Sequence, residues 1–152
     1  MTFSFYSTEK IPESKFLYIS NEYAFTTKPF CSNIDVGILF GASTELGIIS
    51  ETKEVSGFSG YSPKSGWKEK ELDMPSSRKC RLLVDFKTMP IKGVCLGYNP
   101  YCETFFDKKT QIICVGDYNL KATDDYVEFA SDMVAVLREG DLVALWTKIE
   151  IM

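Results

Sequence analysis

The chain has 152 residues, of which 45% are hydrophobic and 25% charged, a composition typical of a folded protein rather than a disordered tail. It carries 17 Lys and Arg against 21 Asp and Glu, a formal net charge of −4, and it contains no histidine. The absence of histidine excludes Ser-His-Asp and Cys-His catalysis within one chain and removes the commonest zinc ligand. We therefore expect a single domain over residues 1–152, with no catalytic, cofactor-binding or metal-binding residues.

The cysteine pattern and the hydropathy pattern bear on where the protein resides. The five cysteines are odd in number and form no CxxC pair, which favours reduced thiols over a disulfide framework. No uncharged apolar run reaches the roughly 18 residues of a membrane span, and charged residues interrupt the first 15 positions. These features predict a cytoplasmic protein that does not contact a membrane.

Short runs rich in apolar and aromatic residues predict strands in the first half of the chain. Two brief runs come first, and two longer ones then flank the turn-forming residues 41–45, which is typical of a hairpin. A further run follows as a continuation of the second hairpin arm. The predicted strands are 3–6, 16–19, 33–40, 46–50 and 53–58.

Residues 57–75 form the segment least typical of regular structure, because glycine and proline recur through it. The segment also carries Phe58, Tyr61 and Trp67. Aromatic side chains in such a loop can bind a partner protein, or they can fold back and plug the core. Both interpretations remain open, and the first makes these three residues candidates for partner binding.

The second half of the chain continues the strand pattern as far as residue 115. A nearly continuous apolar run precedes a turn at Pro90, and a turn at Asn99–Pro100 follows the next strand. Two more runs flank the polar loop 107–110, which predicts a second hairpin. The predicted strands are 80–87, 92–98, 103–106 and 111–115.

The segment after Thr123 has a different pattern, which predicts one amphipathic helix over about 124–139. Plotted at 100° per residue, its apolar side chains fall on one half of a cylinder, with Thr123 as N-cap and Gly140 after the C-terminus. Apolar and polar residues then alternate over about 142–151, which predicts a closing strand. The alternative is a hairpin in which 133–137 and 142–146 pair around 138–141. The apolar residues of the helical face are Tyr126, Val127, Phe129, Ala130, Met133, Val134, Val136 and Leu137.

These elements together predict an α+β fold. Short connections favour antiparallel neighbours, so the expected architecture is a mainly antiparallel, curved β-sheet with the C-terminal helix packed on it.

The opposite face of the expected helix is almost wholly acidic. Residues 117–152 hold eight Asp and Glu against three Lys and Arg. Glu128 and Asp132 form a like-charge pair at i,i+4, and Glu139 lies at the negative end of the helix dipole. Ordinary solubilising charge explains such a face, but so does a basic partner. Under the second interpretation Asp125, Glu128, Asp132 and Glu139 bind that partner.

In size, acidic charge and lack of catalytic motifs the chain resembles bacterial immunity proteins and other small acidic inhibitors. The resemblance implies a non-enzymatic protein that neutralises a basic protein partner, such as a nuclease toxin whose substrate groove is positive. Only residues 76–116 are net basic, with seven Lys and Arg against three Asp and Glu, so direct nucleic-acid binding is not expected.

Two further hypotheses come from other functional classes. Many short strands and abundant aromatics would suit a small-molecule carrier with an apolar cavity inside a curved sheet. An enzyme would have to rely on carboxylates or on Cys80, which lies among Arg78, Lys79 and Arg81.

Overall fold

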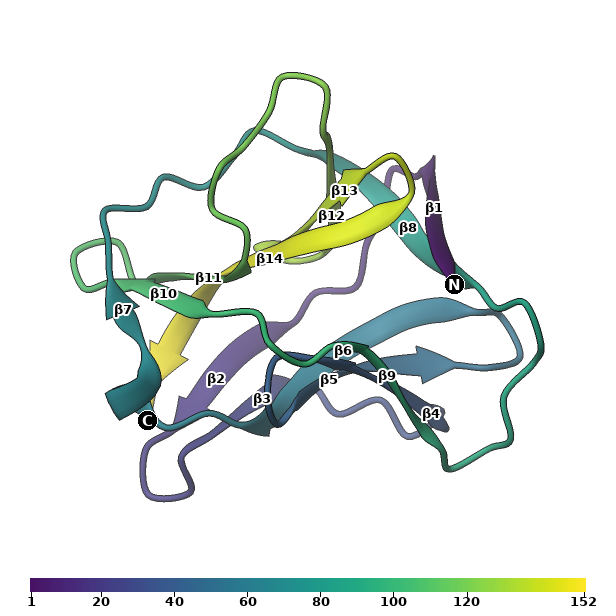
Figure 1. Cartoon of the computed structure of the whole chain (residues 1–152), viewed down its shortest axis with the longest axis horizontal. Coiled ribbons are helices and arrows are strands. Elements are labelled where there is room, and N and C mark those ends of the chain that lie inside the picture. The colour runs from purple at the N-terminus through teal and green to yellow at the C-terminus, as the bar shows by residue number, and fades with distance from the viewer.

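The computed structural model describes all residues from 1 to 152 and consists almost entirely of strands (Figure 1). Fourteen strands are present, and the helical content is one short 3₁₀ turn, η1, at Lys64–Gly66. No helix in the structure is long and apolar enough to cross a membrane. The strands are β1 (Thr2–Ser7), β2 (Lys15–Ile19), β3 (Ala24–Lys28), β4 (Val36–Phe40), β5 (Thr44–Ile49), β6 (Glu54–Tyr61), β7 (Lys68–Glu69), β8 (Arg78–Asp85), β9 (Cys95–Asn99), β10 (Thr104–Asp107), β11 (Ile112–Gly116), β12 (Asp125–Ala130), β13 (Met133–Arg138) and β14 (Asp141–Ile151).

Seven of the strands form a closed ring in the order β8–β12–β13–β14–β2–β3–β6. The ring closes where β6 pairs with β8 at Glu54 and Leu83, and Arg81 donates a hydrogen bond of 2.7 Å to Glu54 at the same place. The long strand β14 joins the two halves of the ring, since it runs in Figure 1 from the β12–β13 pair to β2. Strands β5, β4 and β9 extend the sheet beyond β6. Strand β11 pairs with β14, and β10 pairs in turn with β11.

The sheet is mixed: most of its strand pairings are antiparallel, but parallel pairings, which were not expected from the sequence, are also present. Four of its pairings are parallel: β12 with β8, β14 with β2, β4 with β9, and β10 with β7. Each of these pairs joins strands that are distant in the sequence, so the short connections that favour antiparallel neighbours do not apply to them.

The predicted C-terminal helix over 124–139 is wrong, and with it the α+β class. This segment forms the antiparallel hairpin β12–β13, and β13 then pairs with β14 through a second tight turn, where Arg138 faces Asp141. Glu139 and Gly140 occupy the turn with φ of 52° and 83°, the left-handed values of a two-residue type I′ loop. The closing strand is present over Asp141–Ile151, and the hairpin considered as the alternative is the observed arrangement.

The physical reason for the error is that β13 is buried on both faces. Met133, Ala135 and Leu137 belong to the larger cluster of 27 buried hydrophobic residues, inside the ring. Val134 and Val136 point the other way, into a second cluster of eight residues. A strand with apolar side chains on both faces loses the period-2 alternation, and its continuous apolar run then also fits one side of a helix.

The cover for the second cluster comes from the segment predicted to be least regular. Leu72 lies there with 3% of its surface exposed, and Trp146 packs in the same cluster. The carboxylate of Asp107 holds the segment by accepting a 2.8 Å hydrogen bond from the Leu72 N–H. A polar chain segment thus hides one face of β13 and β14 from water.

Candidate functional site

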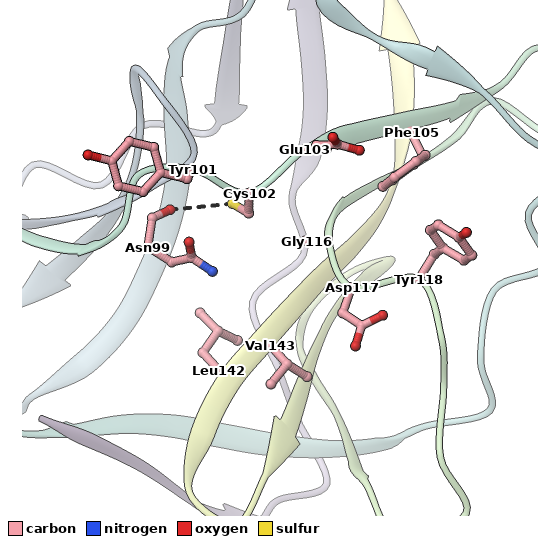
Figure 2. A pocket seen from close by; sticks show the side chains of 10 residues that line it. All are labelled: Asn99, Tyr101, Cys102, Glu103, Phe105, Gly116, Asp117, Tyr118, Leu142 and Val143. Carbon is pink, nitrogen blue, oxygen red and sulfur yellow. Dashed lines mark hydrogen bonds between the residues drawn. The ribbon is translucent and has the colours of Figure 1, made fainter.

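A groove of about 450 Å³ lies where three separate parts of the chain meet near the start of β14 (Figure 2). Residues 99–105 form one wall, residues 116–118 at the end of β11 form another, and Leu142 and Val143 lie at its base. Figure 2 shows Tyr101 and Phe105 at opposite sides of the hollow, with Asp117 and Tyr118 on the Phe105 side.

The backbone of the groove is held by close strand pairing at Gly116. Its φ is 109°, and a Cβ atom at this position would lie 2.4 Å from the carbonyl oxygen of Val143. The Gly116 N–H donates to the Glu103 carbonyl at 2.8 Å, and the Asp117 N–H donates to the Val143 carbonyl at 2.9 Å. Only glycine tolerates both the conformation and the approach, so the walls of the groove are fixed relative to each other.

Aromatic side chains give the groove its apolar surface. Tyr101 is 91% exposed, the most exposed large hydrophobic side chain of the molecule. Phe105 and Tyr118 pack edge to face with ring centroids 4.7 Å apart, and the Lys70 ammonium lies 4.1 Å from the Tyr118 centroid. One aromatic face of the groove therefore already carries a cation from the chain itself.

Carboxylates supply the negative charge of the groove. Glu103 pairs with Lys68 at 2.9 Å, and both side chains are more than half exposed. Such an exposed pair contributes about 0–1 kcal/mol, so an incoming cation can replace Lys68 at little cost. Asp117 is the second acid, and the exposed Asp141 directly precedes Leu142 in the chain.

Arg138 fixes the loop that carries Asp117 and Tyr118. Its guanidinium donates two hydrogen bonds to Asp124, at 2.8 and 2.9 Å, and one to Asp117 at 3.1 Å. The Asp124 side chain is fully buried, and the bonds from Arg138 hold the pKa of that carboxyl below its usual range. Asp117, unlike Glu103, is thus positioned by a largely buried clamp rather than by an exposed surface pair.

The five cysteines of the structure are all free. Burial raises the pKa of Cys102, in the groove, to about 11, and its thiol donates to the Asn99 carbonyl at 3.4 Å. Burial and a hydrogen bond to Glu45 raise the pKa of Cys95 to about 11. Cys80, the candidate nucleophile from the sequence, is completely buried in the larger cluster.

The interior that a carrier would need is occupied by side chains. The larger cluster fills the ring of strands, and the second cluster fills the space under the 70–77 segment. No group of three or more Cys, Asp or Glu side chains is arranged to hold a metal ion.

The structure does not bring the four acidic candidates together on one face. Asp125 lies opposite Leu137 at one end of the hairpin, near an exposed Glu139, and Arg78 approaches it at 3.8 Å. Asp132 lies in the turn at the other end, and its N–H donates to the Glu128 carboxylate at 3.1 Å. The continuous acidic face was expected from the predicted C-terminal helix, and because that helix does not form, the face is absent as well.

The three aromatic candidates of the 57–75 segment also separate. Phe58 is 1% exposed and belongs to the larger core cluster. Trp67 is partly buried and stacks on Phe25 with centroids 5.5 Å apart. Only Tyr61 is exposed, at 53%. Phe58 and Trp67 are therefore core plugs, and Tyr61 alone remains available to a ligand.

Sequence reasoning missed the groove residues Tyr101, Glu103, Asp117 and Tyr118. A local signal existed only for Tyr101, since an aromatic directly after the Asn99–Pro100 turn is placed on a loop. The other three become neighbours only through the pairing of β10, β11 and β14.

No protein-family profile matches the chain, and no curated protein matches it in sequence.

Proposed function

We propose that this protein is a non-enzymatic, cytoplasmic binding protein that neutralises a basic protein partner, in the manner of an immunity protein or antitoxin. The observation that carries the proposal is the groove that a 91% exposed Tyr101 lines on one side and the carboxylates of Glu103 and Asp117 line toward the other. Its partner presents Lys or Arg side chains, and a nuclease toxin with a positive substrate groove is one example.

The chemistry of the groove supports a cationic ligand. An arginine or lysine entering it meets the exposed ring of Tyr101 and a carboxylate, and both groups attract cations. Lys68 and Lys70 already occupy the corresponding positions on Glu103 and Tyr118 within the chain. The partner's cations take over these contacts, and the apolar base at Leu142 and Val143 packs against their aliphatic stems.

The surrounding charge supports the same proposal. Residues 117–152 carry most of the net negative charge, and the exposed Glu139 and Asp141 lie in the turn that leads into the groove. Such a field steers a basic partner toward this end of the molecule and raises the association rate at low salt.

The experiment starts with capture of host proteins on the immobilised chain and identification of those that are retained. Each recovered partner is then purified and its affinity measured by calorimetry against wild type, Tyr101→Ala and Glu103→Lys. We expect a basic partner, and each variant should weaken its binding by roughly 2 kcal/mol or more, about 30-fold.

The matched controls are Phe30→Ala and Glu51→Lys, which alter a 78% exposed aromatic and an exposed acid outside the groove. Both should bind as wild type does. A partner that is acidic, or one whose affinity falls equally with the control variants, contradicts the proposal.

A further inference from the structure

A second concave site lies on the opposite half of the ring, between the β2–β3 turn and the segment that follows β6. It has a volume of about 670 Å³ and shares no residue with the acidic groove. Three tyrosines, two serines, a proline and one lysine line it, and no acidic side chain is among them. We call it the tyrosine cradle, after Tyr18, Tyr23 and Tyr61.

The cradle is rigid because its backbone is tied at Ser62. The Ser62 N–H donates to the Tyr23 carbonyl at 2.7 Å, and the Tyr18 hydroxyl donates to the Ser62 carbonyl at 2.8 Å. The indole N–H of Trp67 donates to the Ser62 hydroxyl at 2.9 Å. Tyr23 itself is held at φ 53°, a left-handed conformation that is unusual for an aromatic residue and turns its side chain outward.

Two aromatic side chains stand at the rim of the cradle with their polar ends free. Tyr23 and Tyr61 are each 53% exposed, with ring centroids 6.3 Å apart and ring planes at 76°. Neither phenol hydroxyl makes a hydrogen bond within the chain, although Tyr18 below them is fully buried and bonded. The rim thus offers an aromatic face, an aromatic edge and two unpaired hydroxyl groups.

These features match the chemistry of a neutral carbohydrate. The C–H face of a pyranose ring is apolar and packs on an aromatic ring, while its hydroxyls need partners that both donate and accept. The phenols and the serines meet that need, and the Lys64 ammonium adds a donor 5.4 Å from the Tyr18 ring centroid. A basic peptide, by contrast, finds no carboxylate here.

We propose that the tyrosine cradle is a carbohydrate-binding site that holds a pyranose unit against Tyr23 and Tyr61. This proposal does not depend on the acidic groove, so either proposal can be disproved while the other stands. Trp67 packs on Tyr18 with ring centroids 4.8 Å apart, so the NMR signal of its indole N–H should shift when a ligand occupies the cradle.

The test is an NMR titration of the ¹⁵N-labelled protein with cellotriose and with triacetylchitotriose, two β-linked sugars with exposed C–H faces. At least one should saturably shift the Trp67 indole N–H and the backbone amides around Tyr23 and Tyr61. Tyr23→Ala and Tyr61→Ala should each weaken that sugar at least tenfold. Tyr61→Phe keeps the ring and loses the hydroxyl, so its affinity for the sugar should lie between that of the alanine variants and that of wild type.

Tyr6→Ala is the matched control, because Tyr6 is 49% exposed on β1 and should have no effect on the titration. Since the substituted side chains are exposed, unchanged thermal unfolding will show that the variants fold. Three results overturn the proposal: no shift with either sugar, shifts that survive both alanine variants, or saturable binding of a hexaproline peptide at the cradle in the absence of sugar binding.

Discussion

The strands of this protein fall into two groups that differ in how many of their faces are buried, and the difference explains why β13 was mistaken for part of a helix. In β4 and β5, one face packs into the larger cluster through Ile38, Phe40, Leu46 and Ile48. The opposite face carries glycines and the partly exposed Leu39 and Glu45. In β11, β13 and the first half of β14, both faces are buried, one in each cluster. We call these groups the one-sided strands and the two-sided strands.

The comparison teaches that burial on both faces is supplied by parts of the chain distant in sequence. The cover over Val134, Val136 and Trp146 includes Leu72 and Phe105, which belong to other strands and to an irregular segment. No sequence pattern within residues 124–147 indicates that a distant segment covers them. In the one-sided strands, by contrast, the positions of large apolar residues already indicate which face is buried.

The two groups also lead to different surfaces. The acidic groove is built on the ends of the two-sided strands β11 and β14. The tyrosine cradle is built on β2, β6 and the connections beside them. Changes in one group should therefore leave the surface of the other intact.

The largest expected effect comes from placing the same polar residue on each group. Val136→Asn buries an amide in the second cluster, at a position that is 0% exposed, and should lower the free energy of unfolding by roughly 3–4 kcal/mol. Leu39→Asn, on the partly exposed face of β4, should cost roughly 1.5 kcal/mol or less. Urea unfolding measures both, and equal losses would break the distinction between the groups.

The next effect concerns the ion pairs of the two regions. Arg138→Met leaves Asp124 buried without its guanidinium and should cost roughly 2–3 kcal/mol. Arg81→Met, at the more exposed closure of the ring with Glu54, should cost about 1 kcal/mol or less. Adding Asp124→Asn to Arg138→Met should recover part of the loss, because the unpaired charge is then removed. A strictly additive double variant would show that the pair is not coupled.

A smaller effect appears on acidification. The hydrogen bond that Asp107 accepts from the Leu72 N–H lowers the pKa of its carboxyl. Hydrogen bonds from Ser50 lower the pKa of Asp35 in the same way. Because the folded pKa lies below the unfolded value of about 3.9, each contribution is complete above that value and is lost as the pH falls through the folded pKa.

Asp107→Asn should therefore be less stable than wild type at pH 7, and the difference should shrink below about pH 4. Denaturant unfolding between pH 7 and pH 2.5 provides the measurement. A difference that grows on acidification would show that the Asp107 carboxylate does not hold the covering segment.

The smallest effect is expected for the double reversal Glu128→Lys with Asp132→Lys. The exchange removes the hydrogen bond from the Asp132 N–H to Glu128 and should cost about 1 kcal/mol or less. Neither residue lines the groove, so affinity for a basic partner should change far less than with Glu103→Lys. If the double reversal and Glu103→Lys weakened the affinity for the partner equally, the β12–β13 hairpin would also have to contact the partner.

The same comparison shows how much of the fold the sequence reveals. Strands close to the observed β1, β2, β4, β5, β6 and β8 could be predicted, as could the 41–45 and 107–110 hairpins and the closing strand. β3 was missed because Phe25 is its only large apolar residue. β12 and β13 were mistaken for a helix because both faces of β13 are apolar. The parallel pairings could not be predicted because they join strands that are distant in the sequence.

The candidate site was less predictable still. Tyr61 was singled out as an aromatic in a loop; it instead ends β6 and lies exposed in the cradle, and Phe58 is core. The groove joins residues 101–105, 117–118 and 142–143, which only tertiary pairing brings together. Asp124, which was expected to be the first residue of a helix, is instead the buried partner of Arg138.

The central claim, that the groove binds basic side chains, is tested most directly by an NMR titration of the ¹⁵N-labelled protein with a hexa-arginine peptide at about 50 mM salt. The account predicts amide shifts concentrated at Tyr101, Glu103, Asp117 and Tyr118, which weaken with added salt and vanish in Glu103→Lys but persist in Glu51→Lys. Shifts distributed over all acidic surfaces, or centred on Glu128 and Asp132, would contradict it.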